Sequence, residues 1–177
     1  IKKKTNSSMV IAFDTLKAND DINAFVTLGS TGAVLTGAVL KAGRIKGVKR
    51  PAFCPVFPNV KGGIVAICDS GANVDCDPQH LQQFAIMASL YLQKAFNIEN
   101  PRVALLNIGT EEEKGDALRK ETFQLLKNNT PSINLEIPFK AVTSLGNILL
   151  KAAVALSTKL SINLSKSALS SAIPVNK

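Results

Sequence analysis

The sequence predicts one α/β domain built around a mostly parallel, doubly wound sheet. Strand-like and helix-like segments alternate along most of the 177 residues, as in βαβ units. Hydrophobic residues make up 46% of the chain and aromatic residues only 5%, which indicates an aliphatic core of strands covered by helices on both faces. Polar, glycine-bearing loops follow the predicted strands, and ligands of such sheets bind beyond the carboxyl ends of the strands.

Apolar periodicity and turn residues divide the chain into alternating elements. In chain order we predict a helix over residues 8–18 capped by Ser8, a strand over 22–28, a helix over 33–42, strands over 51–57 and 63–69, a helix beginning at Asp77 and Pro78, a strand over 102–107, a helix over 118–127, a strand over 133–138 and a helix over 148–160. The pattern weakens beyond residue 128. Its abrupt change over residues 135–146 indicates a missing segment.

We expect a single catalytic domain over residues 1–160, because this length provides one sizeable core but hardly two. Residues 161–177 are rich in Ser, Ala, Leu and Lys, and they predict an amphipathic helix or a weakly ordered end. No apolar run is long enough to span a bilayer. The basic residues 2–4 are not followed by a secretory cleavage pattern, so we expect a cytoplasmic protein.

The formal charge of +8 favours anionic partners. Nucleic acid is disfavoured, because the one short basic cluster, from Lys41 to Arg50, contains no aromatic residue. Phosphorylated metabolites, an acidic carrier protein or an anionic membrane surface fit better. Cys54, Cys68 and Cys76 lack metal-type spacing, so we expect buried free thiols. His80 lies in a first helical turn and is interpreted as structural or exposed rather than as a general base.

Two strand-end loops combine glycine with polar side chains. The first is Gly29-Ser30-Thr31-Gly32 between a strand and a helix. It predicts either a phosphate site made of backbone N–H groups and hydroxyls or an ordinary tight turn whose Ser caps the helix. The second loop, residues 69–75, places two carboxylates and an amide around Gly71. Turn chemistry is the favoured explanation of that composition, and a functional site is the alternative.

A third loop carries the least ordinary pattern, with Asn107, Gly109, Thr110 and Lys114 around three consecutive glutamates. An acidic first helical turn suits the helix dipole and explains residues 111–113. Lys114 opposes that dipole, so its position indicates contact with an anion, although a solvated lysine paired with the glutamates is the alternative.

Several segments together resemble one enzyme family. They are Gly29-Ser30-Thr31-Gly32-Ala33, Gly43-Arg44-Ile45-Lys46-Gly47, Arg50-Pro51-Ala52, Asp69-Ser70-Gly71-Ala72-Asn73-Val74-Asp75 and Pro101-Arg102-Val103-Ala104-Leu105-Leu106-Asn107-Ile108-Gly109-Thr110-Glu111. In this order and spacing they resemble the PlsX family of bacterial phosphate acyltransferases, and the resemblance is continuous over residues 1–127. It implies transfer of a long-chain acyl group from acyl carrier protein to inorganic phosphate, for phospholipid synthesis.

The resemblance also implies a three-layer Rossmann-like fold, similar to that of phosphotransacetylases and of isocitrate and isopropylmalate dehydrogenases. It implies a homodimer that contacts the anionic inner face of the membrane peripherally, with no cofactor and no obligatory metal. The start of the family pattern lies upstream of Ile1, and its Tyr-Gly-Gly and His-Gly segments do not appear. We therefore expect an incomplete sheet and site.

Candidate roles follow from this chemistry. Lys114 holds the phosphate against the thioester, and Asn147 stabilises the developing oxyanion. The candidate phosphate and substrate residues are Ser30, Thr31, Gly32, Asn73, Asn107 and Gly109, and the candidate carrier-protein dock is Arg44, Lys46 and Arg50. Asp69 and Asp75 are expected to position loops rather than to bind a metal. Two rival functions stay open: a phosphate acetyltransferase-like enzyme acting on short acyl-CoA, and a non-catalytic scaffold that binds carrier protein and membrane.

Overall fold

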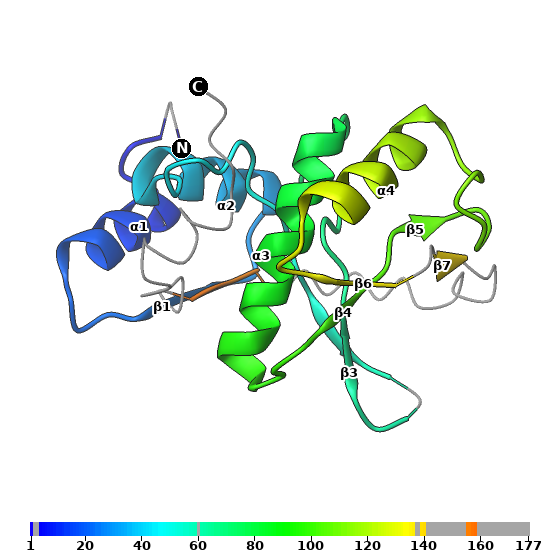
Figure 1. Cartoon of the computed structure of the whole chain (residues 1–177). Helices are drawn as coiled ribbons and strands as arrows, with labels where there is room; N and C mark the ends of the chain where they lie inside the picture. Colours follow the sequence, from blue (N-terminus) through cyan, green and yellow to red (C-terminus); the bar gives the residue numbers. More distant parts are fainter. Residues whose placement is uncertain (2–3, 60, 137–138, 141–154, 159–177) are drawn as a thin grey trace.

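The computed structural model of this chain describes residues 1, 4–59, 61–136, 139–140 and 155–158. Its elements in chain order are α1 (Ser8–Ala18), β1 (Ala24–Thr27), α2 (Thr31–Gly37), the π-helical segment η1 (Ala38–Ala42), β2 (Val56–Pro58), β3 (Ile64–Ala66), α3 (Pro78–Phe96), β4 (Arg102–Val103), β5 (Leu106–Asn107), α4 (Ala117–Asn129), β6 (Asn134–Leu135), β7 (Phe139–Lys140) and β8 (Ala155–Thr158). Helix α3 runs through the middle of the molecule, with α1 and α2 on one side and α4 on the other (Figure 1).

The first helix packs as its periodicity predicts. It buries Val10, Phe13 and Leu16, and the Phe13 ring meets the edge of Phe25 on β1 at a centroid distance of 5.0 Å. The N-cap is Ser7 rather than the predicted Ser8, and its side chain makes no capping hydrogen bond; at the other end the backbone N–H of Asn19 donates to the Thr15 carbonyl. Strand β1 is shorter than the predicted strand over residues 22–28 and alternates exposed with half-buried residues, so it is not the strand covered on both faces that the aliphatic composition indicated.

The two predicted strands that follow form an antiparallel hairpin. Val56 of β2 pairs with Ala66 of β3, and the ladder continues to Pro55, whose carbonyl accepts the Ile67 N–H at 3.1 Å. Asn59 closes the turn, because its N–H donates to the Gly63 carbonyl at 2.8 Å and its side-chain oxygen accepts the Gly63 N–H at 3.0 Å. The hairpin is therefore fixed by turn chemistry as well as by strand pairing.

Helix α3 begins where Asp77 and Pro78 predict. The Asp77 carboxylate accepts the His80 N–H at 2.9 Å, and the His80 Nδ1 accepts the Asp77 N–H at 3.1 Å. This reciprocal capping box satisfies two donors that a helix start leaves unpaired. The helix ends at Phe96, and the C-cap residue Asn97 adopts the left-handed backbone conformation. His80 is only 8% exposed, so the interpretation of it as structural is confirmed.

Acidification is expected to weaken the fold through His80. Burial lowers the pKa of His80 below its ordinary value of 6.5, so the unfolded chain takes up a proton at a pH where the folded chain does not. The contribution of His80 to stability is complete above about pH 6.5 and is lost as the pH falls towards its folded value. His80→Gln keeps a capping side chain but does not titrate. Urea unfolding across this range should show a smaller pH dependence for the variant than for the wild type, and parallel curves would contradict the assignment.

The chain from β4 to β7 is a parallel β-α-β arrangement. Arg102 of β4 pairs with Asn134 of β6, and Leu106 of β5 pairs with Phe139 of β7, both in parallel register, with α4 as the connection. The predicted strand over residues 102–107 is thus split in two. Helix α4 packs beside α3, where the buried Gln82 amide donates to the Thr130 hydroxyl at 2.7 Å. Figure 1 shows α4 above these strands.

Strand β8 corrects one prediction. Residues 155–158 were expected within a helix over residues 148–160, but they form a strand that pairs antiparallel with β1, Ala24 opposite Thr158. The backbone N–H and C=O groups along β1 require partners, and this long-range pairing supplies them. A local periodicity does not contain that information. The tail over residues 161–177 and most of the pattern change over residues 135–146 lie outside the described residues.

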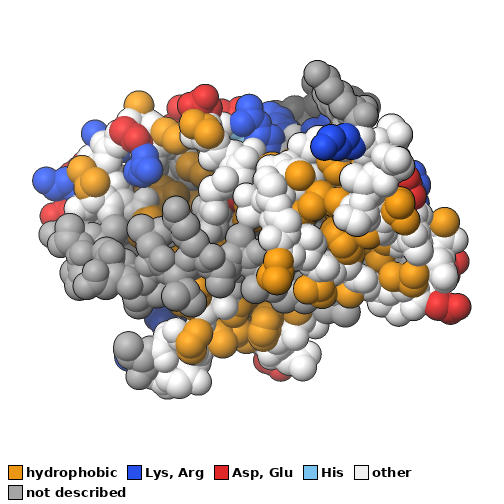
Figure 2. All heavy atoms as spheres, turned by 180° about the vertical axis from the view of Figure 1, so that it is seen from behind, with side chains coloured by type: hydrophobic (Ala, Val, Ile, Leu, Met, Phe, Trp, Pro, Cys, Tyr) orange, Lys and Arg blue, Asp and Glu red, His pale blue; other side chains and the backbone are white. Residues whose placement is uncertain are grey.

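The architecture is α/β, as predicted, but the described pairs are half parallel and half antiparallel, so the expectation of a mostly parallel sheet is not met in this part of the chain. Large hydrophobic side chains stay exposed on strands and strand ends: Val26, Leu28, Val65, Ile67, Leu106 and Ile108. Figure 2 shows hydrophobic side chains spread over one face of the molecule. Among the described residues no helix has the length and apolar character needed to cross a bilayer.

Candidate functional site

Asp69 organises the loop over residues 69–75. One carboxylate oxygen accepts the N–H groups of Phe53 at 2.8 Å and Ala72 at 3.2 Å. The other accepts the backbone N–H of Asn73 at 2.8 Å and its side-chain amide at 3.0 Å. A side chain that satisfies three backbone donors fixes the loop. The expectation that Asp69 positions loops is confirmed.

Asn73 is committed to the same network. Its side-chain Nδ2 donates to the Pro51 carbonyl at 2.9 Å and to Asp69 at 3.0 Å. An amide nitrogen carries two hydrogens, so both donors of Asn73 are used within the protein. The remaining Oδ1 is an acceptor, which repels rather than binds phosphate oxygens. This geometry favours a positioning role for Asn73 over direct contact with an anion.

The basic segment over residues 44–50 is held against the start of α3. The Lys49 N–H donates to the Gln83 side chain at 2.8 Å, and the Gln83 amide donates to the Gly47 carbonyl at 3.0 Å. Gln83 is buried although glutamine is polar. A polar residue on the apolar face of a predicted helix was the available signal for this role, which the sequence analysis missed.

Three cations of this segment differ in their contacts. Arg44 donates to the Lys49 carbonyl and Arg50 to the Asp75 carbonyl, both at 2.6 Å. Asp75 therefore binds Arg50 with its backbone carbonyl and not with its carboxylate. Among the described residues Lys46 forms no hydrogen bond or ion pair and is exposed. Lys46 is therefore the cation of the three that is free to meet a partner.

Asn107 organises the loop over residues 107–115. It is 5% exposed, its amide donates to the Lys114 carbonyl at 2.8 Å, and its Oδ1 accepts the Ile108 N–H at 2.9 Å. Gly115 has a positive φ of 98°, and a Cβ there would overlap Asn107 Oδ1. Only glycine meets both demands. The buried Asn107 amide and Gly115 together fix the backbone position of Lys114, and so the point from which its side chain extends.

Lys114 projects from this loop without a partner. It is exposed, and in the described part of the chain its ammonium group has no ion pair or hydrogen bond. The alternative that it pairs with the neighbouring glutamates is not observed, since Glu112 instead pairs with Lys127 at 2.9 Å. The glutamates also lie outside the first turn of α4, which is capped by Asp116. The dipole explanation for residues 111–113 was therefore wrong, because α4 begins at Ala117, beyond the three glutamates.

The loop over residues 29–32 is an open helix start. Ser30 is the N-cap of α2, and its hydroxyl makes no capping bond. The Gly29 N–H is satisfied locally by the Thr27 hydroxyl at 3.0 Å, while Ser30 and Gly32 are exposed. Ser30 and Gly32 thus face solvent, and the side-chain capping bond that the tight-turn interpretation expects from Ser30 is not observed.

The structure does not gather all three loops in one place. Figure 1 shows the 29–32 loop on the α2 side of α3 and the 107–115 loop on the far side, beyond α4. Asn147, the candidate oxyanion donor, lies outside the described residues. What the structure does bring together is Arg50 with the 69–75 loop, and Asn107 with the backbone of Lys114.

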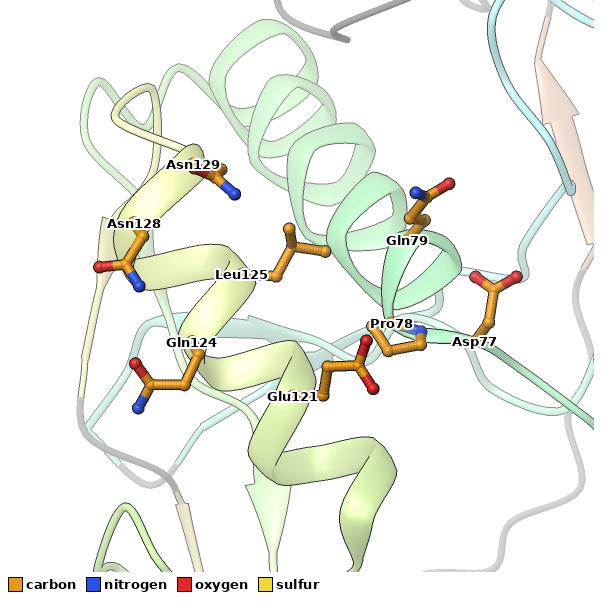
Figure 3. A pocket seen from close by; sticks show the side chains of 8 residues that line it. All are labelled: Asp77, Pro78, Gln79, Glu121, Gln124, Leu125, Asn128 and Asn129. Carbon is orange, nitrogen blue, oxygen red and sulfur yellow. The ribbon is translucent and has the colours of Figure 1, made fainter. Parts of the chain in front are cut away.

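A pocket of about 530 Å³ lies between the start of α3 and α4. Figure 3 shows side chains of both helices around it: Asp77, Pro78, Gln79, Glu121, Gln124, Leu125, Asn128 and Asn129. None of the predicted site residues lines it. Its charged groups are carboxylates, which repel phosphate, so it is not the anion site that the loops predict. Among the described residues no three His, Cys, Asp or Glu side chains are arranged to hold a metal.

The fold places this chain among α/β proteins, and comparison with known sequences narrows the class. A sequence profile described as fatty acid synthesis protein matches residues 1–160. The chain belongs to this family, which confirms the resemblance to PlsX.

Curated relatives share extensive identity with the chain. It is 50% identical over 129 residues to the phosphate acyltransferase of Caldanaerobacter subterraneus subsp. tengcongensis, covering 73% of this chain and 38% of that protein. It is 46% identical over 134 residues to that of Bacillus subtilis, with 76% and 40% coverage. It is 42% identical over 164 residues to that of Clostridioides difficile, with 86% and 48% coverage. The chain spans less than half the length of each relative.

Proposed function

We propose that this chain forms part of an enzyme that transfers a long-chain fatty acyl group from acyl carrier protein to inorganic phosphate. The observation that carries the proposal is the Lys114 ammonium, which has no partner among the described residues, on a loop held by the buried Asn107. Family membership and relatives named phosphate acyltransferase support it. An exposed cation on an internally braced loop suits an anion that must be held in one orientation.

The proposed reaction balances without a protein nucleophile. A phosphate oxygen attacks the thioester carbonyl carbon, a new C–O bond forms, and negative charge develops on the carbonyl oxygen. The C–S bond then breaks, and the carrier thiolate leaves. Lys114 neutralises the phosphate and aligns it, and Asn147 donates a hydrogen bond to the oxyanion. The proposed reaction uses no cofactor and no metal.

The other candidate residues take graded roles. Ser30, Thr31 and Gly32 offer hydroxyl and backbone donors to an anionic group of the substrate. Asn73, Asn107 and Gly109 shape the loops, with Gly109 so close to Lys114 that a Cβ there would lie 2.8 Å from Lys114 Cγ. Because the 29–32 loop lies on the other side of α3, we assign it to a part of the substrate distant from the reacting phosphate.

The proposal extends to the whole assembly. Exposed apolar side chains on β1, β3 and β5 support a three-layer Rossmann-like fold, of the phosphotransacetylase and isocitrate/isopropylmalate dehydrogenase type, in which further segments cover these strands. We propose a homodimer in the cytoplasm that touches the anionic inner face of the membrane, where its fatty acyl product is used. The net charge of +8 supports both an acidic carrier protein and an anionic surface as partners.

A direct assay tests the function. The purified protein is incubated with long-chain acyl carrier protein and phosphate, and acyl phosphate is expected. Product from short acyl-CoA alone, with no use of carrier protein, would favour a phosphate acetyltransferase-like enzyme. Binding of carrier protein and of anionic vesicles without product would favour a non-catalytic scaffold.

Carrier-protein docking is expected to depend on Lys46. Lys46→Glu should slow association with acyl carrier protein and make the rate less sensitive to salt, because a rim charge acts mainly through electrostatic steering. Arg44 and Arg50 are less suitable targets, since both also hold backbone carbonyls. Lys94→Glu makes the same charge change near the far end of α3 and serves as control. Equal association rates for the two variants, measured by stopped flow, would show that carrier protein does not bind at this segment.

A further inference from the structure

Cys54 and Cys68 face each other at the base of the β2–β3 hairpin. The register pairs Val56 with Ala66 and continues through the Pro55 carbonyl, which accepts the Ile67 N–H at 3.1 Å. The next pair outward is Cys54 with Cys68. Hydrogen bonding alternates along antiparallel strands, so this pair is of the non-hydrogen-bonded type, whose Cα atoms lie about 4.5 Å apart. That separation falls within the range that a disulfide spans, about 4.4–6.8 Å.

The two thiols are free, as expected, but like Cys76 they are half-buried rather than buried. Cys68 lies on the inner side of its strand, since Ile64, Ala66 and Cys68 are half-buried while Val65 and Ile67 are exposed. A hydrogen bond from the Cys68 thiol lowers the pKa of Cys54. The same bond, together with burial, raises the pKa of Cys68. Cys54 is thus the more readily deprotonated thiol of the two, an asymmetry typical of reactive cysteine pairs.

We propose that Cys54 and Cys68 are a redox-reactive pair that a peroxide converts to an intramolecular disulfide across the hairpin. The Cys54 sulfur attacks a peroxide oxygen, the O–O bond breaks, and a sulfenic acid forms with release of water. The Cys68 sulfur then attacks the Cys54 sulfur, the S–S bond forms, and the sulfenic oxygen leaves as a second water. Two thiols lose two electrons in total, and one hydrogen peroxide is reduced to two waters.

The pair lies directly beside the Asp69 network. Phe53, which precedes Cys54, donates its N–H to Asp69, and Asp69 follows Cys68 in the chain. A covalent bond between the two cysteines therefore ties together the two segments that Asp69 joins by hydrogen bonds. Oxidation would keep Phe53 and Asp69, which flank the two cysteines, close together even in the unfolded chain. Formation of this disulfide does not depend on the proposed acyl transfer reaction.

Thiol counting tests the proposal in the purified chain. The reduced protein is treated with hydrogen peroxide, denatured and alkylated, and its mass is measured. The reduced chain should carry alkyl groups on all three cysteines. The oxidised chain should carry one alkyl group, and reduction before alkylation should restore the count to three. Three alkylated thiols after peroxide, or irreversible addition of oxygen without a disulfide, would overturn the pair.

Peptide mapping identifies the partners. Trypsin cleaves after Lys61 and leaves Cys54 in residues 50–61, while Cys68 and Cys76 share residues 62–94. The Cys76→Ser variant removes this ambiguity, so a cross-link between the two peptides in that variant assigns Cys54–Cys68. A wild-type cross-link that disappears in Cys76→Ser would assign the bond to Cys76 and reject the proposal. In Cys68→Ala, alkylation of native Cys54 at neutral pH should slow several-fold, because the hydrogen bond that favours its thiolate is lost.

Discussion

Lys114→Met is expected to reduce acyl phosphate formation by about 100-fold or more, the scale of losing a preorganised charge contact in a transition state. Methionine keeps the length and apolar character of the lysine stem but removes the ammonium group. Lys114 is exposed, and its ammonium group forms no hydrogen bond or ion pair in the described part of the chain. The loss should therefore appear in turnover, measured with acyl carrier protein and phosphate, while the urea unfolding curve stays unchanged.

Two matched variants separate charge from position. Lys120→Met removes the same charge from an exposed site on α4 and should leave turnover nearly unchanged, because net charge is lowered equally but no loop cation is lost. Lys114→Arg keeps the charge but changes its geometry, so partial activity is expected. Wild-type turnover in Lys114→Met, in a preparation where the wild type makes acyl phosphate, would remove Lys114 from the reaction.

The helices could be predicted because their signals are local. Asp77 and Pro78 mark the start of α3 without reference to any distant residue, and the periodicity of residues 8–18 gives α1 directly. Strand pairing is different, because β1 is completed by residues 155–158, more than a hundred positions away in the sequence. Nothing in Ala-Leu-Ser-Thr at that position indicates the exposed edge that it covers. The predicted helix there failed for that reason.

The candidate loops could likewise be found from sequence, but not the roles of their side chains. Asn73 and Asn107 were expected to orient a substrate, and each is a polar residue at the end of a strand. Their partners, the Pro51 and Lys114 carbonyls, become neighbours only when the chain folds. Lys114 was recognised because a cation there had no satisfactory local explanation, and in the described part of the chain no glutamate pairs with it.

Asp69→Ala is expected to destabilise the fold by about 3 kcal/mol, because three backbone N–H groups lose their acceptor and each unsatisfied donor costs about 1–3 kcal/mol. The donors come from both sides of the hairpin, from Phe53 on one segment and from Ala72 and Asn73 on the other. The penalty should appear as a lower urea midpoint with an unchanged slope, since the native fold is weakened rather than expanded.

Asp75→Ala is the control within the same loop. The Asp75 side chain is exposed and has no hydrogen bond or ion pair among the described residues, whereas its carbonyl accepts from Arg50 and survives the substitution. Its effect should stay within about 0.5 kcal/mol, as for surface substitutions generally. The destabilisation by Asp69→Asn should fall between those of the two alanine variants, because the amide keeps one acceptor oxygen but turns a donor towards the remaining N–H groups. Equal midpoints for Asp69→Ala and Asp75→Ala would mean that water replaces the carboxylate, and that this loop is held by the Asn73 bond to Pro51 instead.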